Sequence, residues 1–232
     1  MERLILFDID GTILSTNGAA ARGFHRALLE VYGTAGPIET HPFDGKTDPQ
    51  IARELLTLAG LSSEEIEAGF DRLWRAYLRE MAVEFAKPGH ETTLLPGVDR
   101  VLEALEPYRK NSVIGLLTGN LEEGAEMKLG SVGLVDRFVM GAYGSDDERR
   151  DRLPSIAVER ARTLTGREFK GKEIVIIGDT PADITCGQAL GVRAIGVATG
   201  RYSVEELGTA GADLVLPDLS DTESALEALL GS

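Results

Sequence analysis

A short apolar run that ends in two acidic residues constrains this chain more than any other feature. Residues 4–7 are all apolar, Asp8 and Asp10 follow with one residue between them, and Gly11 comes next. An uninterrupted apolar run of this length is typical of a parallel strand that is buried on both faces. We therefore expect a central strand whose carboxyl end carries two carboxylates.

Two carboxylates at this spacing are costly unless a cation lies between them. Asp8 and Asp10 point the same way if the strand continues, whereas Gly11 favours a bend that brings both to the edge of the sheet. Close carboxylates raise each other's pKa, and a hard divalent cation such as Mg²⁺ removes this penalty by taking oxygen ligands. The alternative interpretation is an ordinary strand end followed by an Asp10-Gly11 turn.

Two later apolar runs also end in polar residues. Residues 113–117 lead into Thr118, and residues 174–178 lead into Asp179, with Asp183 four positions further on. Strands that alternate with helical segments indicate a parallel sheet, and such sheets bind ligands at the carboxyl ends of their strands. The sequence therefore predicts that these polar groups gather at one edge of an α/β sheet.

These motifs resemble those of the haloacid dehalogenase-like (HAD) superfamily of hydrolases. That family shows DxDGT, a hydrophobic strand ending in Thr or Ser, a basic residue, and GDxxxD; the first, second and fourth patterns occur here in order and spacing. The resemblance covers the whole chain. It implies a Rossmann-like parallel sheet core, an inserted all-helical C1 cap and a bound Mg²⁺.

Helical periodicity fills the segment after the first strand. Apolar residues recur at helical spacing from about residue 17 to about residue 91, and Ser62 with Glu65 forms a capping box that starts the longest stripe. We expect residues 17–91 to form the cap and residues 1–16 and 92–232 to form the core. The aromatic stripe in the cap is interpreted as the cap's own core.

The resemblance assigns roles to the strand-end residues. It makes Asp8 the nucleophile, Asp10 the general acid and base, and Thr118 a hydroxyl donor to the transferring phosphoryl group. Mg²⁺ is expected on the Asp8 carboxylate, the Asp10 main-chain carbonyl and Asp179. Asp183 is expected to support these ligands from behind, although an acid at a helix start is also favoured by the helix dipole.

The remaining substrate contacts are predicted from loops. The N–H groups of Gly119 and Asn120 precede a helix and suit an anion. Lys46, in a cap loop, is a candidate for the substrate phosphate or leaving group, whereas Asp48 is expected to cap the helix that follows it.

The basic third motif departs from the family pattern, because no Lys-Pro pair precedes the helix. The segment instead holds Arg149, Arg150 and Arg152, and an arginine can replace the lysine with bidentate geometry. Arg150 is the preferred candidate and Arg152 the second. The other arginines of this charge run are expected to be solvated.

These residues favour a phosphatase similar to phosphoglycolate phosphatases, acting on a small phosphorylated metabolite. A phosphomutase of the β-phosphoglucomutase type shares the cap and the aspartyl-phosphate and is the alternative. Asp10 disfavours a dehalogenase, since a halide leaves without a proton. A catalytically idle binding module is disfavoured, because no structural need explains Asp8, Asp10, Thr118 and Asp179 together.

Composition limits the partners and the compartment. The formal net charge of −14 argues against nucleic acid, and no apolar run approaches the ~20 residues that span a bilayer. The single cysteine, Cys186, excludes an internal disulfide and fits a reducing compartment. No signal peptide is visible, so we expect a cytoplasmic protein with no membrane partner, either a monomer or a homodimer.

Overall fold

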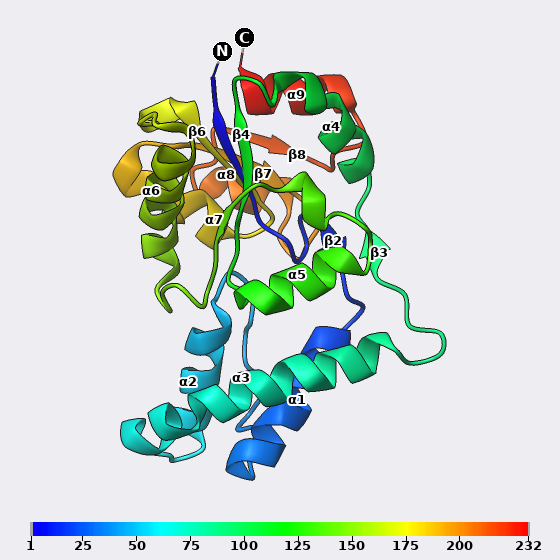
Figure 1. The fold of residues 1–232 in the computed structure, drawn as a ribbon, viewed down its shortest axis with the longest axis vertical. Coiled ribbons are helices and arrows are strands. Elements are labelled where there is room, and N and C mark those ends of the chain that lie inside the picture. The colour runs from blue at the N-terminus through cyan, green and yellow to red at the C-terminus, as the bar shows by residue number, and fades with distance from the viewer. Residues whose placement is uncertain (1, 232) are drawn as a thin grey trace.

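A six-stranded parallel sheet forms one of two lobes in the computed structural model, which describes residues 2–231 (Figure 1). The strand order is β5-β4-β1-β6-β7-β8. The strands are β1 (Leu4–Phe7), β4 (Val113–Leu117), β5 (Gly141–Ala142), β6 (Ile174–Gly178), β7 (Arg193–Val197) and β8 (Leu214–Leu216). The predicted α/β class with a parallel sheet is confirmed.

Strand β1 lies at the centre of this sheet and is buried on both faces. It pairs with β4 on one side and β6 on the other, with Leu4 level with Val113 and Ile174. Ile5 packs in the cluster under α4 (Val98–Ala104) and α9 (Thr222–Leu230), and Leu6 packs in the cluster under α6 (Leu153–Thr165) on the opposite face. Because alternate residues face opposite helical layers, the strand is apolar throughout.

Helices cover both faces of the sheet (Figure 1). Those of the core lobe are α4 (Val98–Ala104), α5 (Glu122–Gly130), α6 (Leu153–Thr165), α7 (Pro181–Cys186), α8 (Val204–Thr209) and α9 (Thr222–Leu230). Among residues 2–231, no helix is both long enough and apolar enough to cross a bilayer.

The second lobe is the helical cap. It consists of α1 (Ala19–Tyr32), α2 (Asp48–Leu58) and α3 (Ser63–Phe85). Phe24 and Tyr77 join α1 to α3 with ring centroids 5.0 Å apart, so the aromatic stripe does pack in the cap's own core. The capping box predicted for Ser62 and Glu65 is present at the start of α3.

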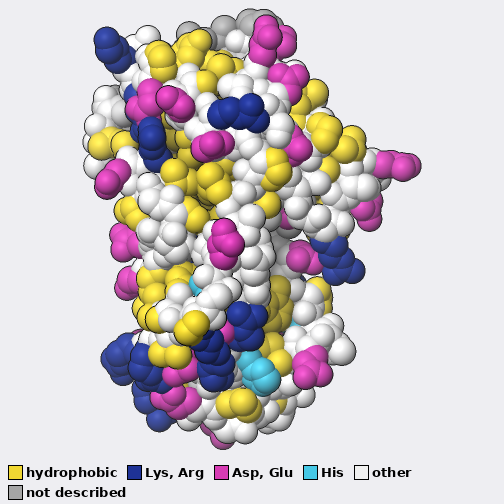
Figure 2. Space-filling view, turned by 90° about the vertical axis from the view of Figure 1, so that its right-hand side faces the viewer, with side chains coloured by type: hydrophobic (Ala, Val, Ile, Leu, Met, Phe, Trp, Pro, Cys, Tyr) yellow, Lys and Arg dark blue, Asp and Glu magenta, His cyan; other side chains and the backbone are white. Residues whose placement is uncertain are grey.

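The chain crosses between the lobes at two adjacent places. β2 (Leu14–Ser15) pairs antiparallel with β3 (Thr93–Leu94), and the Asn17 side chain donates to Glu91 O at 2.8 Å. These crossings lie beside the predicted domain boundaries at 16/17 and 91/92. In space-filling view the two lobes are separated by a hollowed waist (Figure 2).

The pattern of residues 137–140 predicts a short strand, and Ser220 with Glu223 predicts the start of the last helix, but both predictions are wrong in detail. Val135–Arg137 is a 3₁₀ turn, and the strand β5 is Gly141–Ala142. Asp221, and not Ser220, caps the last helix by accepting from Ser224 N at 3.2 Å.

Candidate active site

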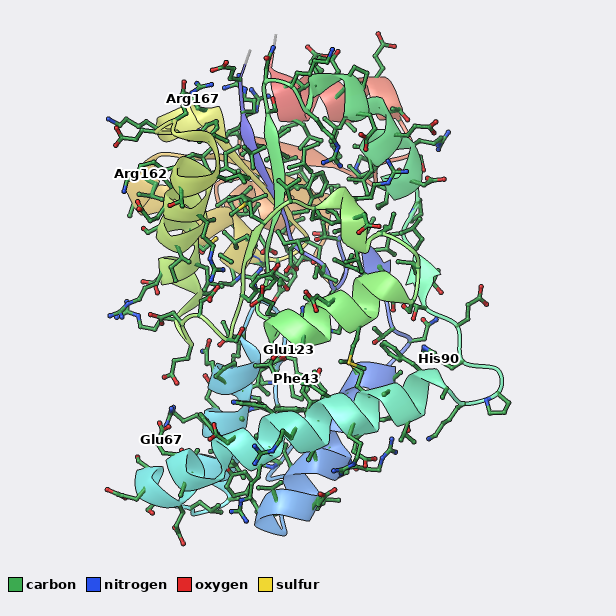
Figure 3. The ribbon with its side chains drawn as sticks, viewed as in Figure 1. Phe43, Glu67, His90, Glu123, Arg162 and Arg167 are labelled. Carbon is green, nitrogen blue, oxygen red and sulfur yellow. The ribbon has the colours of Figure 1, made fainter. Side chains whose placement is uncertain are left out.

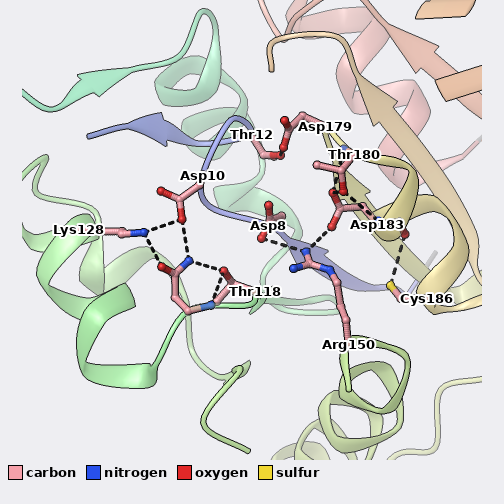
Figure 4. A network of polar contacts seen from close by, with 11 residues as sticks. Asp8, Asp10, Thr12, Thr118, Lys128, Arg150, Asp179, Thr180, Asp183 and Cys186 are labelled. Carbon is pink, nitrogen blue, oxygen red and sulfur yellow. Dashed lines mark hydrogen bonds and ion pairs between the residues drawn. The ribbon is translucent and has the colours of Figure 1, made fainter. Parts of the chain in front are cut away.

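Three adjacent strands deliver polar side chains to one edge of the sheet (Figure 4). Asp8 follows β1, Thr118 follows β4 and Asp179 follows β6, and all three are buried. They line a cavity of about 220 Å³ between the core and the cap. The gathering expected from the sequence is therefore present.

Arg150 brings the positive charge to this edge. Its Nη2 lies 3.1 Å from Asp8 Oδ1 and also binds Asp183 Oδ1, and its side chain is 7% exposed. Arg152, two residues on, is 58% exposed and pairs with Asp147 at 3.2 Å. The 3₁₀ turn Arg150–Arg152 thus directs one arginine inward and the other to solvent.

Burial and mutual repulsion raise the pKa values of Asp8 and Asp179. Burial raises the pKa of Asp8 to about 7, although Arg150 counteracts it, and Asp183 and Asp10 add repulsion. Burial also raises the pKa of Asp179 to about 8, with Asp8 and Asp183 contributing. An additional cation among these carboxylates would restore their ionised forms.

The acids can accept such a cation. Single oxygens of Asp8, Asp179 and Asp183 all lie within 4.8 Å of one another. A Cβ at Gly11 or Gly200 would collide with the Asp179 carboxylate, so both glycines leave space around it. An all-oxygen donor set of this kind fits Mg²⁺.

Asp183 is already occupied by protein donors. Its Oδ2 accepts from Thr180 N at 3.0 Å and Thr180 Oγ1 at 2.7 Å, and its Oδ1 binds Arg150. Asp183 is also the third residue of α7 and completes a capping box with Thr180. Asp183 is therefore more fully hydrogen-bonded than Asp8 and Asp179, and one of its contacts is to Arg150.

Thr118 and the two residues after it form the neighbouring wall. Asn120 Nδ2 donates to Thr118 Oγ1 at 2.6 Å and to Asp10 Oδ2 at 2.8 Å. Gly119 lies against the cap loop so closely that a Cβ would collide with Lys46 O. A larger residue at 119 would therefore push the cap loop away from the site.

Lys128 is a site residue that the motifs do not reveal. Its side chain is 4% exposed, and its Nζ donates to Asp10 Oδ2 at 2.6 Å and to Asn120 Oδ1. A signal was available, because Gly124, Ala125 and Leu129 form the buried face of α5 and Lys128 falls among them at helical spacing. A lysine on the buried face of a helix needs a partner.

The cap loop differs from expectation at Asp48. Thr47 caps α2 by accepting from Gln50 N at 3.2 Å, whereas Asp48 accepts from Leu121 N of the core at 2.9 Å. Burial raises the pKa of Asp48 to about 6, against the opposing effect of Lys128. The capping role belongs to Thr47 because the helix begins at Asp48, one residue earlier than predicted.

Lys46 lines the cavity, but its ammonium has partners within the cap. Nζ binds Glu54 and lies 3.4 Å from His41 Nε2. The cap side of the cavity is otherwise largely aromatic or apolar, with Phe24, Phe43 and Tyr77 among its residues. Phe43 lies between the cap helices and the core (Figure 3).

Comparison with known proteins agrees with this geometry. A family model described as haloacid dehalogenase-like hydrolase matches residues 5–197. The chain belongs to this hydrolase family. The match includes β4, β6 and all but the first residue of β1, with the polar residues that follow these strands, so the resemblance inferred from the motifs is confirmed.

Curated proteins resemble the chain over nearly its full length. A Saccharomyces cerevisiae protein named 2-deoxyglucose-6-phosphate phosphatase 1 is 28% identical, covering 94% of this chain and 88% of its own length. A Pseudomonas fluorescens phosphoglycolate phosphatase is 23% identical over 94% of this chain and 78% of its own length. The crystal structure of a hydrolase from Pseudomonas syringae matches with a TM-score of 0.71 at 21% identity, covering 98% of each chain.

Proposed function

We propose that the protein is a Mg²⁺-dependent phosphomonoester hydrolase that acts on a small phosphorylated metabolite through an aspartyl-phosphate. One observation carries this proposal: Asp8 and Asp10 lie at one cavity, with Arg150 3.1 Å from Asp8 and Lys128 2.6 Å from Asp10. An anionic nucleophile beside a cation, with a separate acid in the same cavity, suits transfer of a phosphoryl group.

Asp8 is the proposed nucleophile. Its carboxylate attacks phosphorus, forming the Asp8–phosphate bond as the bond from phosphorus to the leaving oxygen breaks. Arg150 contacts the same carboxylate and is held by Asp183, so it is placed to neutralise the equatorial phosphoryl oxygens. Nε of Arg150 is buried with no acceptor among the described residues.

Asp10 is the proposed acid and base. It gives its proton to the leaving oxygen in the first step and takes one from the attacking water in the second. Its side chain is 45% exposed and lines the cavity, so a leaving group and a water can both reach it. Thr118 Oγ1 accepts from Asn120, which leaves its own proton for a phosphoryl oxygen.

Asp8, Asp179 and the main-chain carbonyl of Asp10 would hold Mg²⁺, with Asp183 behind them. When bound, the cation supplies positive charge that offsets the repulsion between a carboxylate nucleophile and a phosphate. The raised pKa values of Asp8 and Asp179 support a site that needs such a cation.

A small substrate fits the cavity, whose volume is about 220 Å³. Charged residues lie on the core side of the cavity, among them Asp8, Asp10 and Arg150. Aromatic residues lie on its cap side, namely Phe24, Phe43 and Tyr77. The names of two relatives, a 2-deoxyglucose-6-phosphate phosphatase and a phosphoglycolate phosphatase, support a substrate of this size.

The test is phosphate release from a panel of small phosphomonoesters, with Mg²⁺ and again with a chelator, for the wild type and Asp8→Asn. We expect release by the wild type that depends on the metal and at least about a thousandfold less release by the variant. Release by Asp8→Asn at the wild-type rate would contradict the proposal. A wild type that instead moves phosphate between sugar positions, with a lasting phosphoenzyme, would identify a mutase.

A further inference from the structure

We propose that Lys128 is a positioning residue that holds Asp10 in its acid–base orientation and compensates its charge after proton transfer. The inference rests on the proposed function, because it concerns the acid of that reaction. It assigns a role to a residue outside the four family motifs, on a helix that those motifs do not include.

Burial of Lys128 carries a free-energy cost. Its side chain is 4% exposed, and an ammonium in such a place is unfavourable unless it is paired and hydrogen-bonded. An apolar side chain at this position of α5 could be buried at a much lower free-energy cost. Nζ donates to the Asp10 carboxylate and to the Asn120 amide oxygen. These two contacts offset the cost of burying the ammonium and link Lys128 to Asp10.

The contacts of Asp10 differ between its two carboxyl oxygens. Oδ2 accepts from Lys128 Nζ at 2.6 Å and from Asn120 Nδ2 at 2.8 Å, while Oδ1 has no protein donor among the described residues. Asn120 in turn accepts from Lys128 and donates to Thr118 (Figure 4). This closed set of contacts fixes the plane of the Asp10 carboxyl and leaves Oδ1 to carry the proton.

Lys128 also offsets the negative charge that develops on Asp10 during the reaction. When Asp10 Oδ1 gives its proton to the leaving oxygen, the O–H bond to Asp10 breaks, a new O–H bond forms on the departing alcohol, and Asp10 becomes a carboxylate. Lys128 is already 2.6 Å from Oδ2 and offsets that charge without moving. Its place in the last turn of α5 also faces the negative end of the helix dipole, which favours a cation.

The test compares two substrates in one preparation of enzyme. p-Nitrophenyl phosphate loses a stable phenolate and needs little help from an acid, whereas an alkyl phosphate needs a proton on its leaving oxygen. The quantity compared is kcat/KM, which includes the steps up to departure of the leaving group. A loss of folded protein lowers both values equally and cancels in their ratio.

We expect Lys128→Met to lower kcat/KM for the alkyl phosphate that the wild type hydrolyses best by roughly tenfold to a hundredfold, and for p-nitrophenyl phosphate by less than about threefold. Lys128→Arg should recover part of the loss, because it keeps the charge. Lys110→Met, at an exposed lysine of the core lobe, is the matched control and should change neither value.

A double variant shows whether Lys128 acts through Asp10. Asp10→Asn should show the same preference for p-nitrophenyl phosphate, and adding Lys128→Met to it should not increase that preference. Equal losses on both esters would overturn the inference and leave Lys128 a structural residue. A loss of kcat/KM confined to esters that carry a carboxylate would overturn the inference by assigning Lys128 to substrate binding. A wild type that hydrolyses neither ester would overturn the proposed function itself.

Discussion

Arg150 and Arg152 lie two positions apart, yet their environments differ completely. Arg150 is 7% exposed and carries the contacts to Asp8 and Asp183, whereas Arg152 is 58% exposed. Burial opposes the charge on Arg150, but Asp183 and Asp8 keep its pKa above its ordinary value, so it stays a cation at any working pH. A buried cation of this kind contributes far more to a charged transition state than an exposed one.

Arg150→Ala should therefore lower kcat/KM by an amount equal to about 1.5–3 kcal/mol of transition-state stabilisation, the usual worth of a charged hydrogen bond. Steady-state kinetics on the preferred ester measure it. Arg149→Ala, an exposed neighbour paired with Asp151 at 2.7 Å, is the matched control and should stay within about twofold of the wild type. If Arg152→Ala proves the damaging change, the third motif lies two residues later.

Single residues were predictable where a strand end places them. Asp8, Thr118 and Asp179 follow apolar runs, and such runs locate the carboxyl edge of a parallel sheet without any coordinates. The partners of Asp48 and Lys128 could not be predicted this way. Asp48 meets Leu121 N, 73 positions away, and Lys128 meets Asp10, 118 positions away, so only the folded chain reveals them.

At the scale of elements, an ion-pair cluster joins α1 to the end of α3. Glu84 is fully buried and binds Arg22 at 2.7 Å, and it also binds Arg26 and Lys87. The hydrogen bond from Lys87, followed by those from Arg22 and Arg26, lowers the pKa of Glu84 to about 2 in spite of burial. Figure 2 shows lysine and arginine side chains gathered on the cap lobe.

Glu84→Gln should lower the free energy of unfolding by about 1–3 kcal/mol at pH 7, a range reduced for the solvent screening of its half-exposed partners. The folded-state pKa lies below the ordinary value of 4.5, so this stabilisation is complete above about pH 4.5 and disappears as pH falls toward 2. Urea unfolding at several pH values measures it.

The control for this cluster is Glu64→Gln on the same helix, an exposed residue that should change the free energy of unfolding by less than about 0.5 kcal/mol. A difference between Glu84→Gln and the wild type that stays constant from pH 7 to pH 3 would contradict the account. So would a difference that grows as the solution becomes more acidic.

Elements with strong periodicity were predictable, and elements set by turns were not. β4 and β6 coincide with continuous apolar runs, and α3 begins at its predicted capping box. β5 has two residues, and its backbone is engaged earlier, since Val139 N donates to Ile114 O at 3.1 Å. No pattern fixes where such a short edge strand begins, because it buries few side chains of its own.

At the scale of the whole molecule, the site exists only where the two lobes meet. Asp48 N donates to Gly119 O at 2.8 Å, and Thr47 Oγ1 donates to Glu148 O at 2.7 Å. Arg53 adds an ion pair to Glu148 at 2.8 Å. These contacts hold the cap against the core beside the cavity that Asp8 lines, and partial exclusion of water there strengthens the electrostatic interactions of the buried groups. The sequence predicted the two lobes but not these contacts, which depend on loops from both.

Direct detection of a phosphoryl group on Asp8 tests whether this residue is the nucleophile. The wild type would be mixed with its preferred ester and Mg²⁺, quenched in acid within a single turnover, digested, and analysed by mass spectrometry. We expect one added phosphoryl group on the peptide that contains Asp8, and none on that peptide from Asp8→Asn. A phosphoryl group on another residue, or full turnover with no phosphoenzyme at any quench time and wild-type activity in Asp8→Asn, would contradict it.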